Sequence, residues 1–298
     1  MVELGSARPK IPRLSYEYFA KQVDQKTNEA VGFVPLEDVF ASGRVCFSEG
    51  DVVHDVGAGP GYSTEYLQSY VPDCKKKSVI WIASEPTSSN CEQIKTRFGE
   101  ENVCALNLDA IEAVKVVRYS TKIFFLNGIH MLEPAERIEF FRQSFESLGP
   151  RGQLVITSAF TSEAVDEQVQ RDVLNPWMIA VFREAKSRGV DLGDLKEGLE
   201  IVKKQVWSID RYRQEILDAG FQPDFFETLD MPCNWETYRR ISHYEGWNQR
   251  TLPDLKDRQA AVINFTALKK TMRRLGKSWN DPAPRNTLVM VARKPKAA

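Results

Sequence analysis

The sequence predicts an α/β protein built on a doubly wound, largely parallel sheet. Short apolar runs recur along the chain, and segments with helical periodicity separate them. The run at 52–56 leads directly into a turn with three alternating glycines and then into a helix, which is the opening of a nucleotide-type α/β unit. Two later runs end in acids, Glu85 and Asp109. Because such sheets bind ligands at the carboxyl ends of their strands, the acids predict a ligand site there.

The composition of the chain argues against several classes of binding partner. The chain has 298 residues, 42% hydrophobic and 27% charged, with a formal net charge of −1. This balance gives no overall attraction to nucleic acid or to an anionic membrane, and no apolar run has the length of a membrane span. The five cysteines lack C-x-x-C spacing and the three histidines lack metal-ligand spacing. We therefore expect a cytoplasmic protein without a metal site; the oligomeric state is open.

The first element is the strand 52–56 with its glycine turn. The turn has the spacing D-x-G-x-G-x-G from Asp55, whereas a dinucleotide fingerprint would need a glycine at Tyr62. Glycines let the backbone turn sharply and approach a ligand, and the following helix offers free N–H groups. An acid at the end of the strand suits a ligand with a positive amine and would repel a pyrophosphate.

This stretch resembles motif I of the class I S-adenosylmethionine (SAM)-dependent methyltransferases, and especially fungal members that modify small metabolites. The resemblance implies a Rossmann-like sheet of seven strands, with the last strand antiparallel, and helical lid insertions. It implies SAM as cofactor and S-adenosylhomocysteine as product. It also implies cofactor contacts from the turn, at Asp55, Gly57, Ala58, Gly59 and Gly61.

The second strand, 78–85, is a continuous apolar run that suits burial on both faces of a parallel sheet. Its terminal acid, Glu85, lies about twenty residues past the glycine turn, where an acid can hydrogen-bond a ribose diol. The resemblance places Pro86 beside the cofactor as well; a solvated strand end is the alternative for Glu85. Ser89 and Glu92 form an S-x-x-E pattern, which predicts a capping box at the start of the next helix.

The third strand and its turn occupy 103–110. In the resembled family an acid here accepts a hydrogen bond from the adenine amine, so Asp109 is the expected contact, and Ala110 would leave room for the ring. Many members continue with an apolar-Pro-Phe turn, whereas this chain continues from Ile111 to Ala113 with a different sequence. A helix N-cap is the alternative role for Asp109, and it is compatible with adenine binding.

The fourth strand ends in the loop Asn127-Gly128-Ile129-His130, which should face the reacting methyl group. DNA and protein amide methyltransferases carry an Asn/Asp-Pro-Pro-aromatic tetrad here, so the loop is more similar to that of small-molecule enzymes. Asn127 and Gly128 are expected cofactor contacts. His130 could orient a substrate oxygen or take its proton, or it could cap the helix that starts near Pro134. That helix should bury an apolar stripe of Ile138, Phe141, Phe145 and Leu148, and the fifth strand should follow at 152–160.

Insertions interrupt the strand pattern after residue 160. The expected organisation is an N-terminal helical cap at 1–50, a SAM-binding core at 51–160, a helical lid at 161–205, core again at 206–230, a second lid at 231–285, and the last strand with a tail at 286–298. In the family the N-terminal segment covers the cofactor, which makes Tyr16 a candidate contact; a core role is the alternative. Within the first lid, Pro176–Phe182 is apolar on nearly every side, as in a buried helix or a pocket wall.

The predicted function is SAM-dependent methyl transfer to a small molecule of secondary metabolism, with oxygen as the favoured acceptor atom. Of the six tryptophans, all but Trp81 lie at or beyond Trp177, which favours an apolar or aromatic acceptor or simply a packed lid. Nitrogen or sulfur methylation stays open. A SAM-binding protein that does not methylate, either a regulator or a catalyst of a rearrangement, is the alternative of another class. An NAD-dependent oxidoreductase is disfavoured by Tyr62 and Asp55, and nucleic-acid methylation ranks last.

Overall fold

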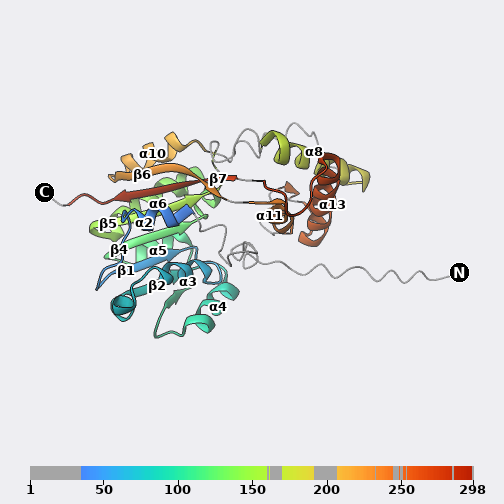
Figure 1. Ribbon diagram of the computed structural model, residues 1–298. Helices are drawn as coiled ribbons and strands as arrows, with labels where there is room; N and C mark the ends of the chain where they lie inside the picture. Colours follow the sequence, from blue (N-terminus) through green and yellow to red (C-terminus); the bar gives the residue numbers. More distant parts are fainter. Residues whose placement is uncertain are drawn as a thin grey trace.

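The computed structural model describes residues 35–159, 161, 170–190, 207–231, 233–243, 248, 251–252, 254–283 and 285–296. Within these ranges the strands form one seven-stranded sheet in the order β3-β2-β1-β4-β5-β7-β6 (Figure 1). Strands β1 to β5 pair in parallel, whereas β7 is antiparallel to both of its neighbours, β5 and β6. The predicted fold class is confirmed, including the antiparallel last strand.

The strands are β1 (Val52–Val56), β2 (Ile80–Ser84), β3 (Cys104–Leu106), β4 (Ser120–Leu126), β5 (Leu148–Ser158), β6 (Gln222–Met231) and β7 (Arg285–Arg293). Strands β1 and β4 lie at the centre, and their residues are almost all buried, as expected of apolar runs in a covered parallel sheet. The fifth strand begins at Leu148 rather than Gly152, because the sheet pairing starts with Leu148 opposite Ser120.

The α-helices are α2 (Pro35–Ala41), α3 (Tyr62–Ser69), α4 (Ser88–Phe98), α5 (Ala110–Val116), α6 (Pro134–Ser147), α8 (Asn175–Ser187), α10 (Ile209–Asp218), α11 (Trp235–Ile241) and α13 (Asp257–Leu275). The capping box predicted at Ser89 is wrong: Thr87 is the N-cap of α4, and its side chain makes no capping hydrogen bond. The predicted burial of Ile138 is also wrong. It is 54% exposed, whereas Phe141 and Leu148 of the same predicted stripe are buried and Phe140 is buried beside them. Among the described helices, none combines the length and apolarity of a membrane span.

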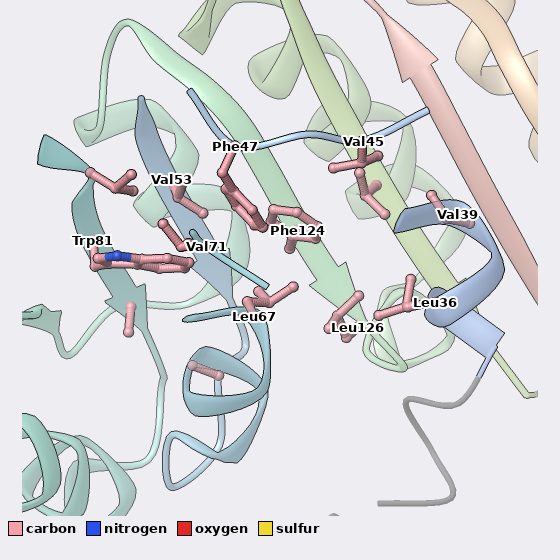
Figure 2. Packing of buried hydrophobic residues seen from close by; sticks show 14 of the residues in the cluster. Leu36, Val39, Val45, Phe47, Val53, Leu67, Val71, Trp81, Phe124 and Leu126 are labelled. Atoms are coloured by element: carbon pink, nitrogen blue, oxygen red, sulfur yellow. The ribbon is translucent and has the colours of Figure 1, made fainter. Parts of the chain in front are cut away.

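Two apolar cores lie on opposite faces of the sheet. On one face Val53, Trp81 and Phe124 pack with Phe47 and with helices α2 and α3 (Figure 2). On the other face Phe125 packs with residues of α5, α6 and α10. Successive side chains of a strand point to opposite faces, so the neighbours Phe124 and Phe125 belong to different cores.

A third core joins helices α8, α11 and α13 into a lobe, which we call the helical lobe. It lies beyond the ends of the strands, on the side where β6 ends and β7 begins (Figure 1). Its centre is aromatic: Trp177, Trp235 and Tyr238 are all nearly inaccessible to solvent. The indole Nε1 of Trp177 donates to the backbone carbonyl of Asn264, at 2.9 Å, and so ties α8 to α13. The apolar stretch Pro176–Phe182 is therefore part of a buried helix.

Candidate functional site

The glycine turn after β1 has the backbone shape that its sequence predicts. Gly57, Gly59 and Gly61 have φ angles of 65°, 54° and 94°, in the left-handed region that favours glycine. The turn is held against β2, because the amide of Ala58 donates to the carbonyl oxygen of Ser84 at 3.0 Å. Helix α3 begins directly after the last glycine, so its first N–H groups lie beside the turn.

Asp55 lies at the end of β1 and is completely buried. Its Oδ2 accepts hydrogen bonds from the hydroxyls of Ser63, at 2.6 Å, and Thr64, at 2.7 Å, both in the first turn of α3. Its Oδ1 is buried and has no hydrogen-bond partner among the described residues. Burial raises the pKa of the carboxyl to about 6. The hydrogen bonds from the Ser63 and Thr64 hydroxyls lower the pKa and partly offset this rise, and the nearby Glu85 carboxylate raises it a little further. A buried acceptor of this kind calls for a donor, and a cationic donor most of all.

Glu85 ends β2 and connects two loops. Its Oε2 accepts from the amide of Gly59 at 3.1 Å, and its Oε1 accepts from the amide of Thr87 at 3.1 Å and from Asn90 Nδ2 at 3.2 Å. The side chain is nearly buried. A carboxylate has about four acceptor positions, so these bonds leave capacity for a ligand hydroxyl. Together with Asp55, the carboxylate makes the carboxyl ends of β1 and β2 negative.

The loop after β3 is fixed to the loop after β2. Nδ2 of Asn107 donates to the carbonyl oxygens of Glu85 and Pro86, at 2.9 Å each. Asp109 is the N-cap of α5, and its Oδ1 accepts from the amides of Ile111 and Glu112 at 2.9 Å. The capping alternative for Asp109 is thus present, and Oδ2 makes no hydrogen bond within the described part of the chain. Ala110 follows as the first residue of α5.

The loop after β4 is anchored to β5. Asn127 adopts a φ of 53°, its amide donates to Thr157, and its Oδ1 accepts from the amide of Ala159 at 3.1 Å. His130 is half-buried in a one-turn 3₁₀ helix, Ile129–Met131, that follows Gly128. It does not cap α6: the N-cap there is Glu133, which forms a capping box with Glu136.

Sequence reasoning missed the residues that hold the expected contacts in place. Ser63 and Thr64 orient Asp55, Asn90 orients Glu85, and Asn107 pins the loop that carries Asp109. A usable signal for the first pair is two adjacent hydroxyl residues in the first turn of the helix, separated from the third glycine by one residue. The amides carry no comparable signal, because their partners are set by loop geometry. Tyr16 lies outside the described residues.

The described residues contain no group of histidine, cysteine, aspartate and glutamate side chains that could hold a metal ion. What the carboxyl edge offers is a glycine turn, two buried carboxylates and an exposed third one. The buried Oδ1 of Asp55, which has no donor among the described residues, fits the ammonium group of an amino acid moiety. Hydroxyl-binding capacity at Glu85, one strand away, fits a ribose. The residues present therefore fit SAM, and they fit a pyrophosphate poorly.

No protein-family model matches the chain, and no curated protein matches it. Solved structures do match. A cyclopropane synthase from Mycobacterium tuberculosis has a TM-score of 0.54 at 12% identity, over 92% of this chain and 88% of the other. A protein of Bacillus halodurans assigned as a methyltransferase has a TM-score of 0.52 at 14% identity, over 87% and 100%. The cyclase SpnF has a TM-score of 0.50 at 14% identity, over 88% and 82%. The chain thus has the Rossmann-like methyltransferase fold.

Proposed function

We propose that the chain is a SAM-dependent methyltransferase that acts on a small molecule. The observation that carries the proposal is the state of Asp55 at the end of β1, beside a glycine turn and a second carboxylate. Its Oδ1 is buried and accepts no hydrogen bond from the described residues. Leaving a carboxylate oxygen buried without a donor costs free energy in the unliganded protein. An ammonium group from the methionine end of SAM would supply the missing donor and the opposite charge.

The other contacts follow the resemblance, residue by residue. Gly57, Ala58, Gly59 and Gly61 would pass close to the methionine moiety, and Glu85 and Pro86 would lie against the ribose. Asp109 and Ala110 would contact the adenine, with Asn127 and Gly128 on the β4 side. Asp109 is an exposed residue whose Oδ1 caps α5, which leaves Oδ2 to accept from the adenine amine and supports this role.

The chemistry would depend mainly on alignment. SAM supplies a methyl group on a sulfonium, which is already an activated electrophile. The protein then needs to hold the acceptor atom in line with that methyl group and exclude water, and alignment of this kind can contribute on the order of 7–11 kcal/mol. His130 lies in the loop after β4, where it could take the proton of an acceptor hydroxyl. A base there suits an acceptor hydroxyl or amine more than a thiolate, and oxygen is the acceptor atom we propose.

The acceptor itself is inferred from the resemblance to fungal enzymes that modify small metabolites, and a secondary metabolite is the proposed class. The lobe tryptophans give this inference less support than their number suggests, because Trp177 and Trp235 fill the lobe's own core. We place the protein in the cytoplasm; the five cysteines, all free in the structure, agree with a reducing compartment.

Calorimetric titration of the purified protein with S-adenosylhomocysteine, and with NAD⁺ as control, tests the cofactor. We expect micromolar binding of the first and none of the second. Failure to bind S-adenosylhomocysteine, or preference for NAD⁺, would contradict the proposal. Transfer of a labelled methyl group from SAM into extracted small molecules then tests methylation. Tight SAM binding with no transfer to any of them would instead favour the non-methylating alternative.

A further inference from the structure

The ring of Phe125 lies directly beneath two loops of the proposed cofactor site. A Cβ atom placed on Gly57, in the turn after β1, would lie 3.0 Å from ring carbon Cε2. A Cβ placed on Gly128, in the loop after β4, would lie 2.8 Å from both Cδ2 and Cζ and still closer to Cε2. The same ring therefore lies against the backbone of both loops.

The ring cannot easily move away. Phe125 is 4% exposed, and its ring packs against that of Phe140 with the ring centroids 4.8 Å apart. Interiors are packed at close to crystal density, so a buried ring in such a place transmits displacement rather than absorbing it. Both loops approach the same edge of this ring, at Cε2 and Cδ2, so the position of the ring limits how each loop can lie.

Gly128 shows that close approach, and not backbone shape, requires a glycine in the second loop. Its φ and ψ are −115° and −26°, which an L-residue can adopt without strain. Gly57 differs, because its φ of 65° favours glycine whatever its neighbours are. A substitution at Gly128 therefore tests the contact with Phe125 separately from the conformation of the chain.

We propose that Phe125 is a positioning residue that sets the spacing between the cofactor turn and the loop that carries His130. This inference rests on the proposed function and goes beyond it, because it assigns a role to a side chain that contacts neither ligand. The turn at Gly57 would hold the methyl donor, and the loop that begins at Gly128 would hold the acceptor side. In-line transfer depends on their separation, and a misplacement of about 1 Å can cost on the order of a hundredfold in rate.

The test compares Phe125→Leu with Phe124→Leu. Both residues lie in β4, both are buried, and each change removes the same atoms, but Phe124 faces the opposite core with Phe47 and Val53. We expect both variants to unfold at lower urea concentrations. Only Phe125→Leu should weaken S-adenosylhomocysteine binding, by roughly tenfold, which corresponds to about 1.4 kcal/mol. Equal effects of the two variants on affinity, or none from Phe125→Leu, would overturn the proposal.

A rescue experiment adds a readout that a merely structural residue would not give. Gly128→Ala alone should weaken both folding and S-adenosylhomocysteine binding, because the new methyl group meets the ring. In the double variant Gly128→Ala/Phe125→Leu the ring edge is gone, so affinity should return to that of Phe125→Leu alone. Additive losses would contradict the contact. If the wild-type protein bound no S-adenosylhomocysteine, the proposed function and this positioning role would both fail. Non-additive changes in the free energy of unfolding of the single and double variants would still establish the contact between Phe125 and Gly128.

Discussion

Asp55 is the residue on which the account depends most. A carboxylate with no solvent access and no cationic partner among the described residues is unfavourable in the unliganded protein, and burial accordingly raises its pKa to about 6. The hydroxyls of Ser63 and Thr64 satisfy only Oδ2. The side chain is thus oriented by α3 but incompletely neutralised, as expected of a group that awaits a cation.

Ligand affinity should therefore depend on pH in the acidic range. A cation prefers the ionised carboxylate, so bound ligand lowers the pKa of Asp55 and a proton is released on binding near pH 6. We expect S-adenosylhomocysteine affinity to be constant from pH 7 to 8 and to fall by up to about tenfold per pH unit below pH 6. Calorimetry in two buffers of different ionisation enthalpy measures both effects. An affinity that is the same at pH 5 and 7.5 would contradict the assignment.

The same pKa predicts a conflict between stability and binding. The carboxyl binds a proton more tightly in the folded chain, with a pKa of about 6, than at its ordinary value of 3.8. The stabilisation from protonated Asp55 is complete below pH 3.8 and is lost as the pH rises through about 6. Asp55→Asn should hence raise the free energy of unfolding at pH 7.5, by up to the order of 3 kcal/mol, while weakening ligand binding. Ser63→Ala, which removes a donor from the carboxylate, should lower stability at this pH. Destabilisation by Asp55→Asn would count against a raised pKa.

At the scale of elements, the helical lobe is held together by its own aromatic core. Trp177 on α8 is fully buried and donates its indole N–H to α13. Lys270 of α13 adds an ion pair with Glu184 of α8, at 2.5 Å. These contacts make the lobe a packed unit, and they remove Trp177 from consideration as a wall of the acceptor pocket.

Trp177→Phe tests this reading. The change removes the hydrogen bond and leaves a small void, so we expect a loss of about 1–3 kcal/mol in the free energy of unfolding, measured with urea. Trp279→Phe is the matched control, because that ring is only half-buried and stacks on Phe265 at 6.2 Å; its effect should be smaller. S-adenosylhomocysteine affinity should not change in either variant. Unchanged stability of Trp177→Phe would contradict a core role and would favour a role for Trp177 in lining the acceptor pocket.

Elements that local patterns specify were predicted well from the sequence. Short apolar runs predicted β1, β2 and β4, and the spacing along the chain predicted the glycine turn and the strand-end acids Asp55 and Glu85. Helix starts were less predictable. The S-x-x-E pattern predicts Ser89 as the N-cap of α4, but the loop after β2 starts the helix earlier and makes Thr87 the N-cap. Contacts between distant residues, such as Phe125 with Gly57, leave no periodic trace in the sequence.

At the scale of the whole molecule, the sheet order brings separate stretches of sequence to one edge. The order β3-β2-β1-β4 places Asp109, Glu85, Asp55 and the loop at Asn127 at the carboxyl ends of neighbouring strands. A ligand with an amine at one end and an adenine at the other could span these ends. The helical lobe stands beyond the same edge of the sheet (Figure 1).

The most direct test of the central claim compares S-adenosylhomocysteine with 5′-methylthioadenosine, which keeps the adenine, ribose and sulfur but lacks the amino acid moiety. Their dissociation constants should be measured for the wild-type protein and for Asp55→Asn. We predict that the wild type binds S-adenosylhomocysteine at least tenfold more tightly, a difference of about 1.4 kcal/mol, and that the preference largely disappears in Asp55→Asn. Equal affinity of the wild type for both compounds, or an unchanged preference in the variant, would contradict the account of Asp55.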